Sequence, residues 1–195
     1  MTSPVPQVRA RHIQFWLELV ERYEEPWRGR FFAALPAELR SKALEAVPAS
    51  FLPIDYHVTL ADVLRATLGD ARAHDFYRHA IRASLAGPLF APLVQTAVRL
   101  FGLSPATCVR WAPKAWHASF SNAGSVTAED VGADHGRLVY RGLPRVCIES
   151  DAWVESSQGS AYGVLEMTGV RGVVRIDQRE RPNGGYALEL EWTPK

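Results

Sequence analysis

Histidine is the residue type with the widest chemical range in this 195-residue chain, and its six copies are not spaced for a shared metal site. His74 and His79 are five residues apart on a predicted helix, which turns them about 140° away from each other, whereas two ligands on one helical face need a spacing of three or four. Either one alone could be the axial ligand of a haem group. The competing interpretation is a solvated helix histidine, and His12, His117 and His135 are predicted to be surface residues.

His57 has a different setting from the other histidines. It ends the sequence Asp55-Tyr56-His57, between Pro53 and a predicted helix start, and loops beside helix starts often carry binding groups. We therefore take Tyr56 and His57 as candidate ligand-binding or partner-binding residues. Two alternatives stay open: a structural hydrogen bond that holds the loop, and an enzyme site in which Asp55 and His57 converge with another polar group.

Two glycines one helical turn apart mark a second candidate site. Gly159 and Gly163 fall in a segment of helical spacing at 156–169, although each glycine costs a helix about 1 kcal/mol relative to alanine. A close approach to a neighbour would explain that cost. Either this helix packs tightly on a sheet, or its bare face borders a ligand or partner subunit, with Tyr162 and Met167 as flanking contacts.

Other arrangements for catalysis or metal binding lack the spacing they require. In Gly159-Ser160-Ala161-Tyr162-Gly163 the centre is alanine, whereas a nucleophile elbow needs serine there. Cys108 and Cys147 are far apart, and no CxxC or HxxxH pair supports a zinc site, so both are predicted to be free thiols. No GxGxxG or Walker sequence occurs. We therefore predict no catalytic residue, no metal and no cofactor.

The elements that must position the candidate residues predict an α+β fold, in which an N-terminal helical layer packs on a C-terminal antiparallel sheet interrupted by one helix. Amphipathic or apolar patterns predict helices around 13–20, 36–46, 59–68, 70–85, 92–101, 104–113 and 156–169. Alternating or β-branched runs predict strands at 116–120, 125–128, 137–140, 146–149, 173–178 and 186–192. The last two would form a hairpin with one solvated face.

Length and composition favour one domain spanning 1–195, with 1–113 mainly helical and 114–195 holding the sheet. The 47% hydrophobic content can supply a full core, and 22 basic against 21 acidic residues argue against nucleic acid as a partner. No apolar run reaches the roughly 18 residues that a membrane span needs. Residues 1–11 lack the apolar run of a secretory signal, so the cytoplasm is the predicted location.

Arginines concentrate in the C-terminal half of the chain. They are Arg137, Arg141, Arg145, Arg171, Arg175, Arg179 and Arg181. A solvated sheet face balanced by acidic residues is one interpretation. A docking surface for an acidic partner is the other.

The order of elements, several helices followed by a small antiparallel sheet interrupted by one helix, resembles the plan of three related domains: the vinyl-reductase domain, the small subunits of the TRAPP tethering complex and the haem-nitric-oxide-binding domain. Short phrases also resemble a functionally uncharacterised family found chiefly in myxobacteria. They are Leu35-Pro36 with Leu39-Arg40, Pro53-Ile54-Asp55-Tyr56, Arg99-Leu100-Phe101-Gly102 with Ser104-Pro105, Gly142-Leu143-Pro144, and Leu188 to Trp192.

The resemblance implies a sensor or scaffold. Vinyl-reductase domains are regarded as small-molecule-binding modules, and the TRAPP subunits use an internal apolar channel and flat dimer surfaces. Haem-binding members need a histidine on a helix and a Tyr-x-Ser-x-Arg motif on a later strand, whereas this chain has Tyr140-Arg141-Gly142-Leu143-Pro144 near that place.

The favoured hypothesis is thus a non-enzymatic regulatory or scaffold domain that binds a small apolar ligand, a protein partner or a second copy of itself. A haem-based gas sensor is the first alternative. An enzyme with a site near Asp55 and His57 is the second.

Overall fold

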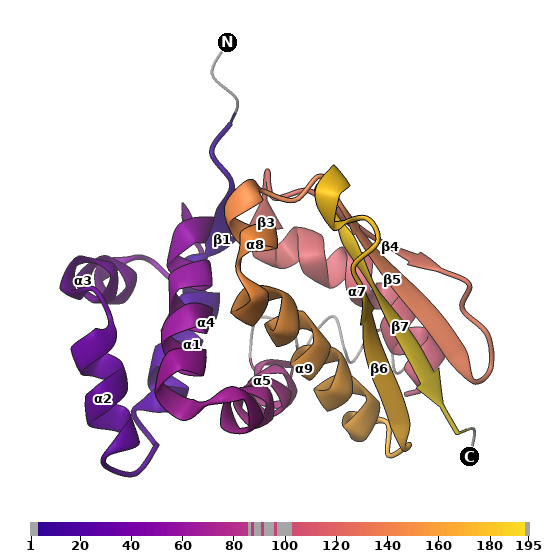
Figure 1. Cartoon of the computed structure of the whole chain (residues 1–195), viewed down its shortest axis with the longest axis horizontal. Helices are drawn as coiled ribbons and strands as arrows, with labels where there is room; N and C mark the ends of the chain where they lie inside the picture. Colours follow the sequence, from indigo (N-terminus) through magenta and orange to yellow (C-terminus); the bar gives the residue numbers. More distant parts are fainter. Residues whose placement is uncertain (1–3, 86, 88–90, 92–95, 97–102, 194–195) are drawn as a thin grey trace.

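The computed structural model describes residues 4–85, 87, 91, 96 and 103–193, and its N-terminal half is mainly helical (Figure 1). The elements of this half are β1 (Gln7–Arg9), α1 (Ala10–Val20), α2 (Trp27–Ala34), α3 (Ala37–Glu45), β2 (Phe51–Pro53), α4 (Ile54–Leu68) and α5 (Asp70–Leu85). The C-terminal half contains α7 (Pro105–Ser119), β3 (Phe120–Ser121), β4 (Ser125–Glu129), β5 (His135–Arg141), α8 (Arg145–Glu149), α9 (Asp151–Met167), β6 (Gly172–Asp177), the 3-10 turn η1 (Arg181–Asn183) and β7 (Tyr186–Trp192).

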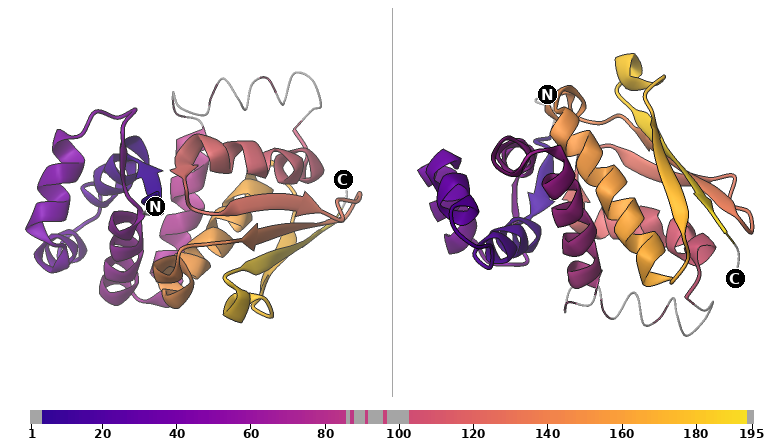
Figure 2. Two further views of the ribbon diagram at one scale, coloured as in Figure 1. Left: turned by 90° about the horizontal axis from the view of Figure 1, so that it is seen from above. Right: turned by 60° about the horizontal axis from the view of Figure 1, so that its bottom comes forward.

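The C-terminal strands form a four-stranded antiparallel sheet in the order β4-β5-β7-β6. In its central register Leu188 of β7 lies opposite both Leu138 of β5 and Ile176 of β6. In a smaller sheet, β2-β1-β3, the N-terminal strand pairs with β2 and with β3, which directly follows α7. Helices α7 and α9 pack on one face of the large sheet, and α9 also packs on α4 and α5 of the N-terminal half (Figure 2). The structure thus confirms the predicted α+β class.

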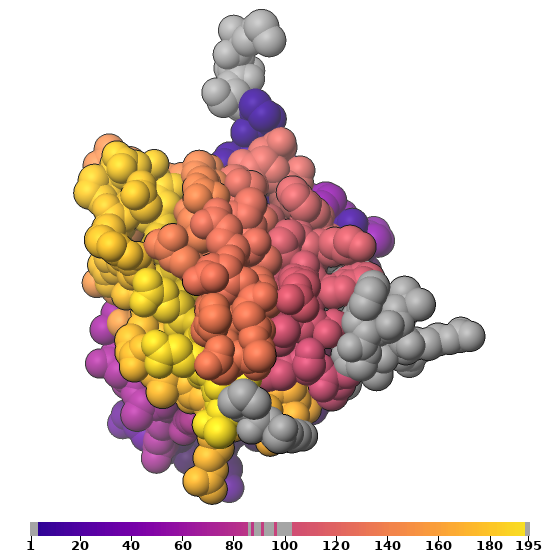
Figure 3. All heavy atoms as spheres, turned by 90° about the vertical axis from the view of Figure 1, so that its right-hand side faces the viewer, coloured from indigo at the N-terminus to yellow at the C-terminus, as the bar shows by residue number. Residues whose placement is uncertain are grey.

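The two faces of the large sheet follow from the alternation along β7. Its apolar residues Tyr186, Leu188, Leu190 and Trp192 are buried, whereas its glutamates point to solvent. Figure 3 looks onto the side of the molecule where the solvent face of this sheet lies. That face carries a row of ion pairs. The pairs are Arg175–Glu191 at 2.7 Å, Arg137–Asp177 at 3.0 Å, Arg141–Glu129 at 2.9 Å and Arg179–Glu189 at 3.8 Å. The arginines here are balanced by carboxylates, which favours the solvated interpretation.

Helix α9 lies against α5 through its two glycines. A Cβ on Gly159 would come within 2.8 Å of the Tyr77 Cβ, and one on Gly163 would overlap Ile81 and lie 2.5 Å from the Arg78 carbonyl oxygen. The predicted close approach is therefore present. Its partner is a helix and not the sheet, which corrects the expectation for this face.

The structure differs from several of the predicted elements. Residues 146–149 belong to α8, which begins directly after Pro144, and not to a strand. Residues 116–119 are the last turn of α7, which continues through Pro113. Helix α4 begins at Ile54, so Thr59 lies inside it and Asp55-Tyr56-His57 forms its first turn. The predicted helix at 92–101 lies, apart from Thr96, outside the described residues.

Buried side chains from both halves form one core, from Val8 and Trp16 to Trp153 and Trp192. Among the described residues, no helix has the length and apolar character to cross a membrane.

Candidate functional site

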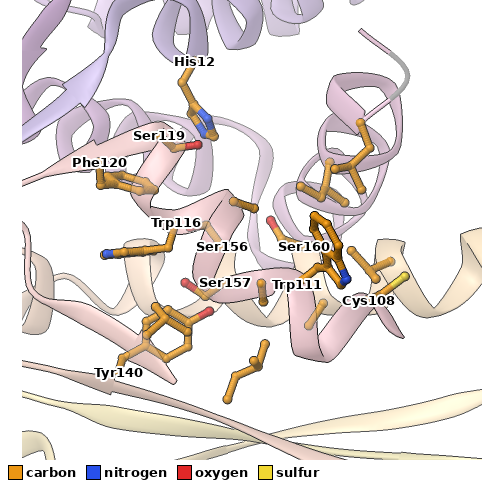
Figure 4. A pocket seen from close by; sticks show the side chains of 18 of the residues that line it. His12, Cys108, Trp111, Trp116, Ser119, Phe120, Tyr140, Ser156, Ser157 and Ser160 are labelled. Carbon is orange, nitrogen blue, oxygen red and sulfur yellow. The ribbon is translucent and has the colours of Figure 1, made fainter. Parts of the chain in front are cut away.

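A largely apolar cavity of about 230 Å³ lies between the N-terminal helices, α7, α9 and the large sheet (Figure 4). Its described lining residues come from α1, α4, α5, the segment just before α7, α7 itself, β3, β4, β5 and α9. They are His12, Trp16, His57, Ile81, Leu85, Leu103, Thr107, Cys108, Trp111, Ala112, Ala115, Trp116, Ser119, Phe120, Val126, Leu138, Tyr140, Trp153, Ser156, Ser157, Ser160, Ala161, Val164 and Met167. The described lining contains no Asp, Glu, Lys or Arg, so histidine is its one residue type that can become charged near neutral pH.

Helix α7 forms one wall because its lining residues repeat every three or four positions. Cys108, Ala112, Ala115 and Ser119 share one face, and the two alanines leave the space that larger side chains would fill. The opposite wall is α9, whose Ser156, Ser157, Ser160 and Val164 follow the same spacing. The cavity therefore lies where two helices meet through small side chains.

Stacked aromatic rings make one end of the cavity rigid. Trp116 stacks on Phe120 with ring centroids 4.2 Å apart and meets Tyr140 edge to face at 5.5 Å. Tyr140 stacks in turn on Tyr186 at 4.5 Å, and the Tyr186 hydroxyl donates to Ser157 Oγ at 2.7 Å. Burial raises the pKa of both tyrosines, so both stay as neutral phenols.

His57 is the polar group with the most constrained chemistry in the cavity. Only 4% of its surface is exposed, and its Nδ1 accepts a hydrogen bond from the Trp153 indole Nε1 at 3.1 Å. An indole nitrogen can only donate, so Nδ1 is the unprotonated nitrogen and the neutral ring carries its hydrogen on Nε2. Nε2 is buried without a hydrogen-bond partner among the described residues.

The electrostatic setting keeps this imidazole neutral. Burial, with a smaller contribution from the adjacent His12, lowers the pKa of His57 well below its usual value. The two rings meet edge to face with centroids 4.7 Å apart. Burial also lowers the pKa of the half-buried His12 to about 4. Both rings are therefore uncharged at neutral pH, and His57 offers one N–H donor.

The structure divides the members of both candidate sites that the sequence predicts. His57 and Met167 line the cavity, whereas Gly159 and Gly163 lie against α5 and do not. Tyr162 also lies outside it, with its ring 5.3 Å from His74.

The first turn of α4, which carries Asp55, Tyr56 and His57, shows whether these residues could form an enzyme site. Tyr56 is half-buried outside the cavity lining, and Asp55 is exposed while His57 points inward. Residues two apart on a helix point about 200° from each other, so Asp55 and His57 do not converge. The convergence of Asp55 and His57 that the enzyme alternative requires is not present.

The candidate haem ligands of α5 are also outside the cavity. His79 is exposed, and His74 packs on Tyr162. The prediction that His12 is a surface residue is wrong, because its side chain lines the cavity. A usable signal was its spacing of four from Trp16, because that spacing places both on one face of α1.

Comparisons with solved structures show the fold. The chain is similar to an H-NOX protein from K. algicida, with 10% identity and a TM-score of 0.64 over 96% of this chain and 97% of that one. It is similar to an H-NOX protein from S. oneidensis in its Fe(II)NO ligation state, with 12% identity and a TM-score of 0.61 over 95% and 99%. A structure from work on heme distortion in the H-NOX family gives 12% identity and a TM-score of 0.60 over 96% and 95%.

These likenesses confirm the haem-nitric-oxide-binding topology that the order of elements resembles. No model of a known protein family matches the chain, and no curated protein matches it. Membership of the family found in myxobacteria stays a prediction.

Because the similar structures include a haem protein, the cavity residues can be tested against a haem group. Helix α7 presents residues such as Cys108, Trp111 and Ala112 to the cavity and no histidine, since its His117 is exposed. The described residues also contain no cluster of three or more histidine, cysteine or acidic side chains suited to a metal ion.

His57 and the residues after Tyr140 also lack the features that haem binding would need. His57 Nε2 carries a hydrogen as long as Trp153 donates to Nδ1, and a protonated nitrogen has no lone pair for iron. In Tyr140-Arg141-Gly142-Leu143-Pro144, Gly142 and Pro144 stand at the serine and arginine places of Tyr-x-Ser-x-Arg. The residues present do not fit a haem held in the way that the family resemblance implies.

Proposed function

We propose that the chain is a non-enzymatic, ligand-binding regulatory domain whose cavity holds a small, uncharged and mainly apolar molecule. The observation that supports this most directly is the cavity itself, with apolar walls and one buried N–H donor on His57. Sites for small molecules are typically concave and apolar, with a few polar groups that fix orientation. At about 230 Å³ the cavity is somewhat smaller than the roughly 300–1,000 Å³ of sites for drug-sized molecules. This volume favours a ligand with no more than two or three rings.

The chemistry of the walls supports binding over catalysis. Burial raises the pKa of the Cys108 thiol to about 11, so this side chain stays protonated and is a poor nucleophile. The described lining holds no carboxylate, lysine or arginine, and a charged ligand would be buried without a counter-ion.

The position of the cavity supports a regulatory role. Its walls come from α1, α4 and α5 of the N-terminal half and from α7, α9, β4 and β5 of the C-terminal half. A ligand that contacts both halves stabilises the arrangement in which they are packed together. Binding of a protein partner or a second copy, and a cytoplasmic location, stay predictions from the sequence.

The test is titration with naphthalene, followed by tryptophan fluorescence, because Trp16, Trp111, Trp116 and Trp153 line the cavity. We expect saturable quenching in the wild type. Ala112→Phe fills the space between α7 and α9 and should abolish it, whereas Ala71→Phe on the exposed surface of α5 should leave it unchanged. Equal quenching in both variants, or none in the wild type, would contradict the proposal.

Haem binding is the second candidate, and the likeness to H-NOX structures is what favours it. Since His74 and His79 lie outside the cavity and His57 Nε2 carries a hydrogen, His12 is the lining histidine that remains as a possible haem ligand. Protein produced with a haem supply should show no Soret band if the cavity is a site for an uncharged organic ligand. A stoichiometric Soret band that is lost in His12→Ala would establish haem and remove the first proposal.

A further inference from the structure

We infer that the ligand carries an uncharged hydrogen-bond acceptor, a carbonyl oxygen or an aromatic ring nitrogen, which is bound by His57 Nε2–H in a tautomer that Trp153 fixes. This inference rests on the proposed function and specifies its ligand class.

The first step is the unpartnered donor. Buried polar groups in folded proteins nearly always have a hydrogen-bond partner, and a buried donor without one is costly. His57 is 4% exposed, yet its Nε2 has no partner among the described residues. The rings around it belong to His12 at 4.7 Å, Trp16 at 4.5 Å and Phe120 at 5.8 Å, and none of these contacts is a hydrogen bond.

The second step is the rigidity of the donor. His57 is on α4 and Trp153 is on α9, so their bond at 3.1 Å joins two helices from different halves. The Ser150 side chain accepts from the Trp153 backbone N–H at 3.0 Å and donates to Asp62 of α4 at 2.6 Å. The same two helices are thus tied one turn away, which holds the indole N–H against Nδ1. Trp153 is therefore a positioning residue.

The third step is the kind of acceptor. An anion would lack a counter-charge, because His57 and His12 are neutral and the described lining holds no lysine or arginine. A metal ion needs a lone pair that Nε2 does not offer in this tautomer. The stacked rings of Trp116, Phe120 and Tyr140 favour a flat molecule. A planar, uncharged compound with one acceptor atom fits all three conditions.

The experiment compares two probes of nearly the same shape at neutral pH: naphthalene, which has no acceptor, and quinoline, which has one ring nitrogen. Wild-type protein should bind quinoline about tenfold more tightly, the effect of one hydrogen bond to an otherwise unpaired donor. His57→Phe keeps an aromatic ring but removes the donor. It should bind the two probes with equal affinity.

The outcomes separate this inference from the function on which it rests. Equal affinities for the two probes in the wild type, or a quinoline preference that survives His57→Phe, would overturn the inference and leave the ligand-binding function intact. If neither probe binds, both fail.

A second measurement avoids dependence on the folding of a variant. Nitrogen NMR of the histidine rings in wild-type protein should show His57 with unprotonated Nδ1 and protonated Nε2, and quinoline but not naphthalene should move the Nε2 proton downfield. Trp153→Phe should allow the other tautomer while the ring stays in place. Detection of a hydrogen on Nδ1 of wild-type His57 would overturn the inference.

Discussion

At the scale of single residues, the cavity depends on two histidines that are uncharged in the folded protein. Histidine in an unfolded chain has a pKa near 6.5, whereas burial lowers the folded value of His12 to about 4 and that of His57 well below its usual range. The proton that each ring would take up in the unfolded state is therefore excluded from the folded state. Protonation is linked to stability through this difference.

The sign of the pH dependence follows directly. Above pH 6.5 both states leave the rings neutral and the full stability is present. As the pH falls from 6.5 towards 4 the unfolded state binds protons first, so the free energy of unfolding should fall by about 1.4 kcal/mol per pH unit for each histidine. Urea unfolding at a series of pH values measures this slope.

The control is His12→Asn, which keeps a polar side chain on α1 but removes one titrating ring. Its slope in that pH window should be smaller than that of the wild type by about 1.4 kcal/mol per unit. An unchanged slope would show that His12 titrates normally in the folded protein.

At the scale of elements, the contact between α5 and α9 depends on small side chains at Gly159 and Gly163. It is reinforced at the end of α9, where Arg78 and Arg82 of α5 pair with Glu166. Because the backbone of α5 lies next to Gly163, any side chain there must move a helix and not only a neighbouring side chain.

We expect Gly163→Ala to lower the free energy of unfolding by about 1–3 kcal/mol, because overlap with Ile81 and the Arg78 carbonyl outweighs the gain in helix propensity of about 1 kcal/mol. The matched control is Gly29→Ala in α2. The new Cβ there would meet only the flexible end of Glu25, so stability should rise by up to about 1 kcal/mol. Chemical unfolding measures both. Equal effects of the two substitutions would contradict the packing argument.

Local patterns predicted some of these elements and failed at others for physical reasons. Ser104-Pro105 starts α7 as expected, with Ser104 accepting from the Thr107 backbone N–H at 3.1 Å. The alternation at 116–120 predicts a strand, but residues 116–119 are the last turn of α7 beyond Pro113 and only Phe120 is extended. Trp116 is buried here, and its indole N–H donates to the Gly124 carbonyl at 3.3 Å. Tertiary contacts here override the usual effect of an internal proline.

At the scale of the whole molecule, the class of fold was accessible from the sequence and the site was accessible only in part. The spacing of β6 and β7 predicts their pairing, and the order of helices and strands indicates the H-NOX topology. His57 could be singled out because of its local setting. Its partner Trp153 is 96 positions away in the chain, and no local pattern relates the two.

The cavity could not be predicted for the same reason, since local patterns do not relate residues that are far apart in the chain. Its walls combine residues from His12 to Met167, and its space arises from Ala112 and Ala115, which read as ordinary helix formers in the sequence. The spacing of Gly159 and Gly163 correctly indicated a close approach, but only the tertiary arrangement shows that α5 is the neighbour.

The most direct test of the account is an NMR measurement of through-space contacts between bound naphthalene and the side-chain methyl groups of the protein. The account predicts contacts to Ile81 of α5, Ala115 of α7 and Leu138 of β5 together, because all three line one cavity between the two halves. Contacts confined to exposed apolar residues such as Leu44 or Val173, with none to these three, would contradict it.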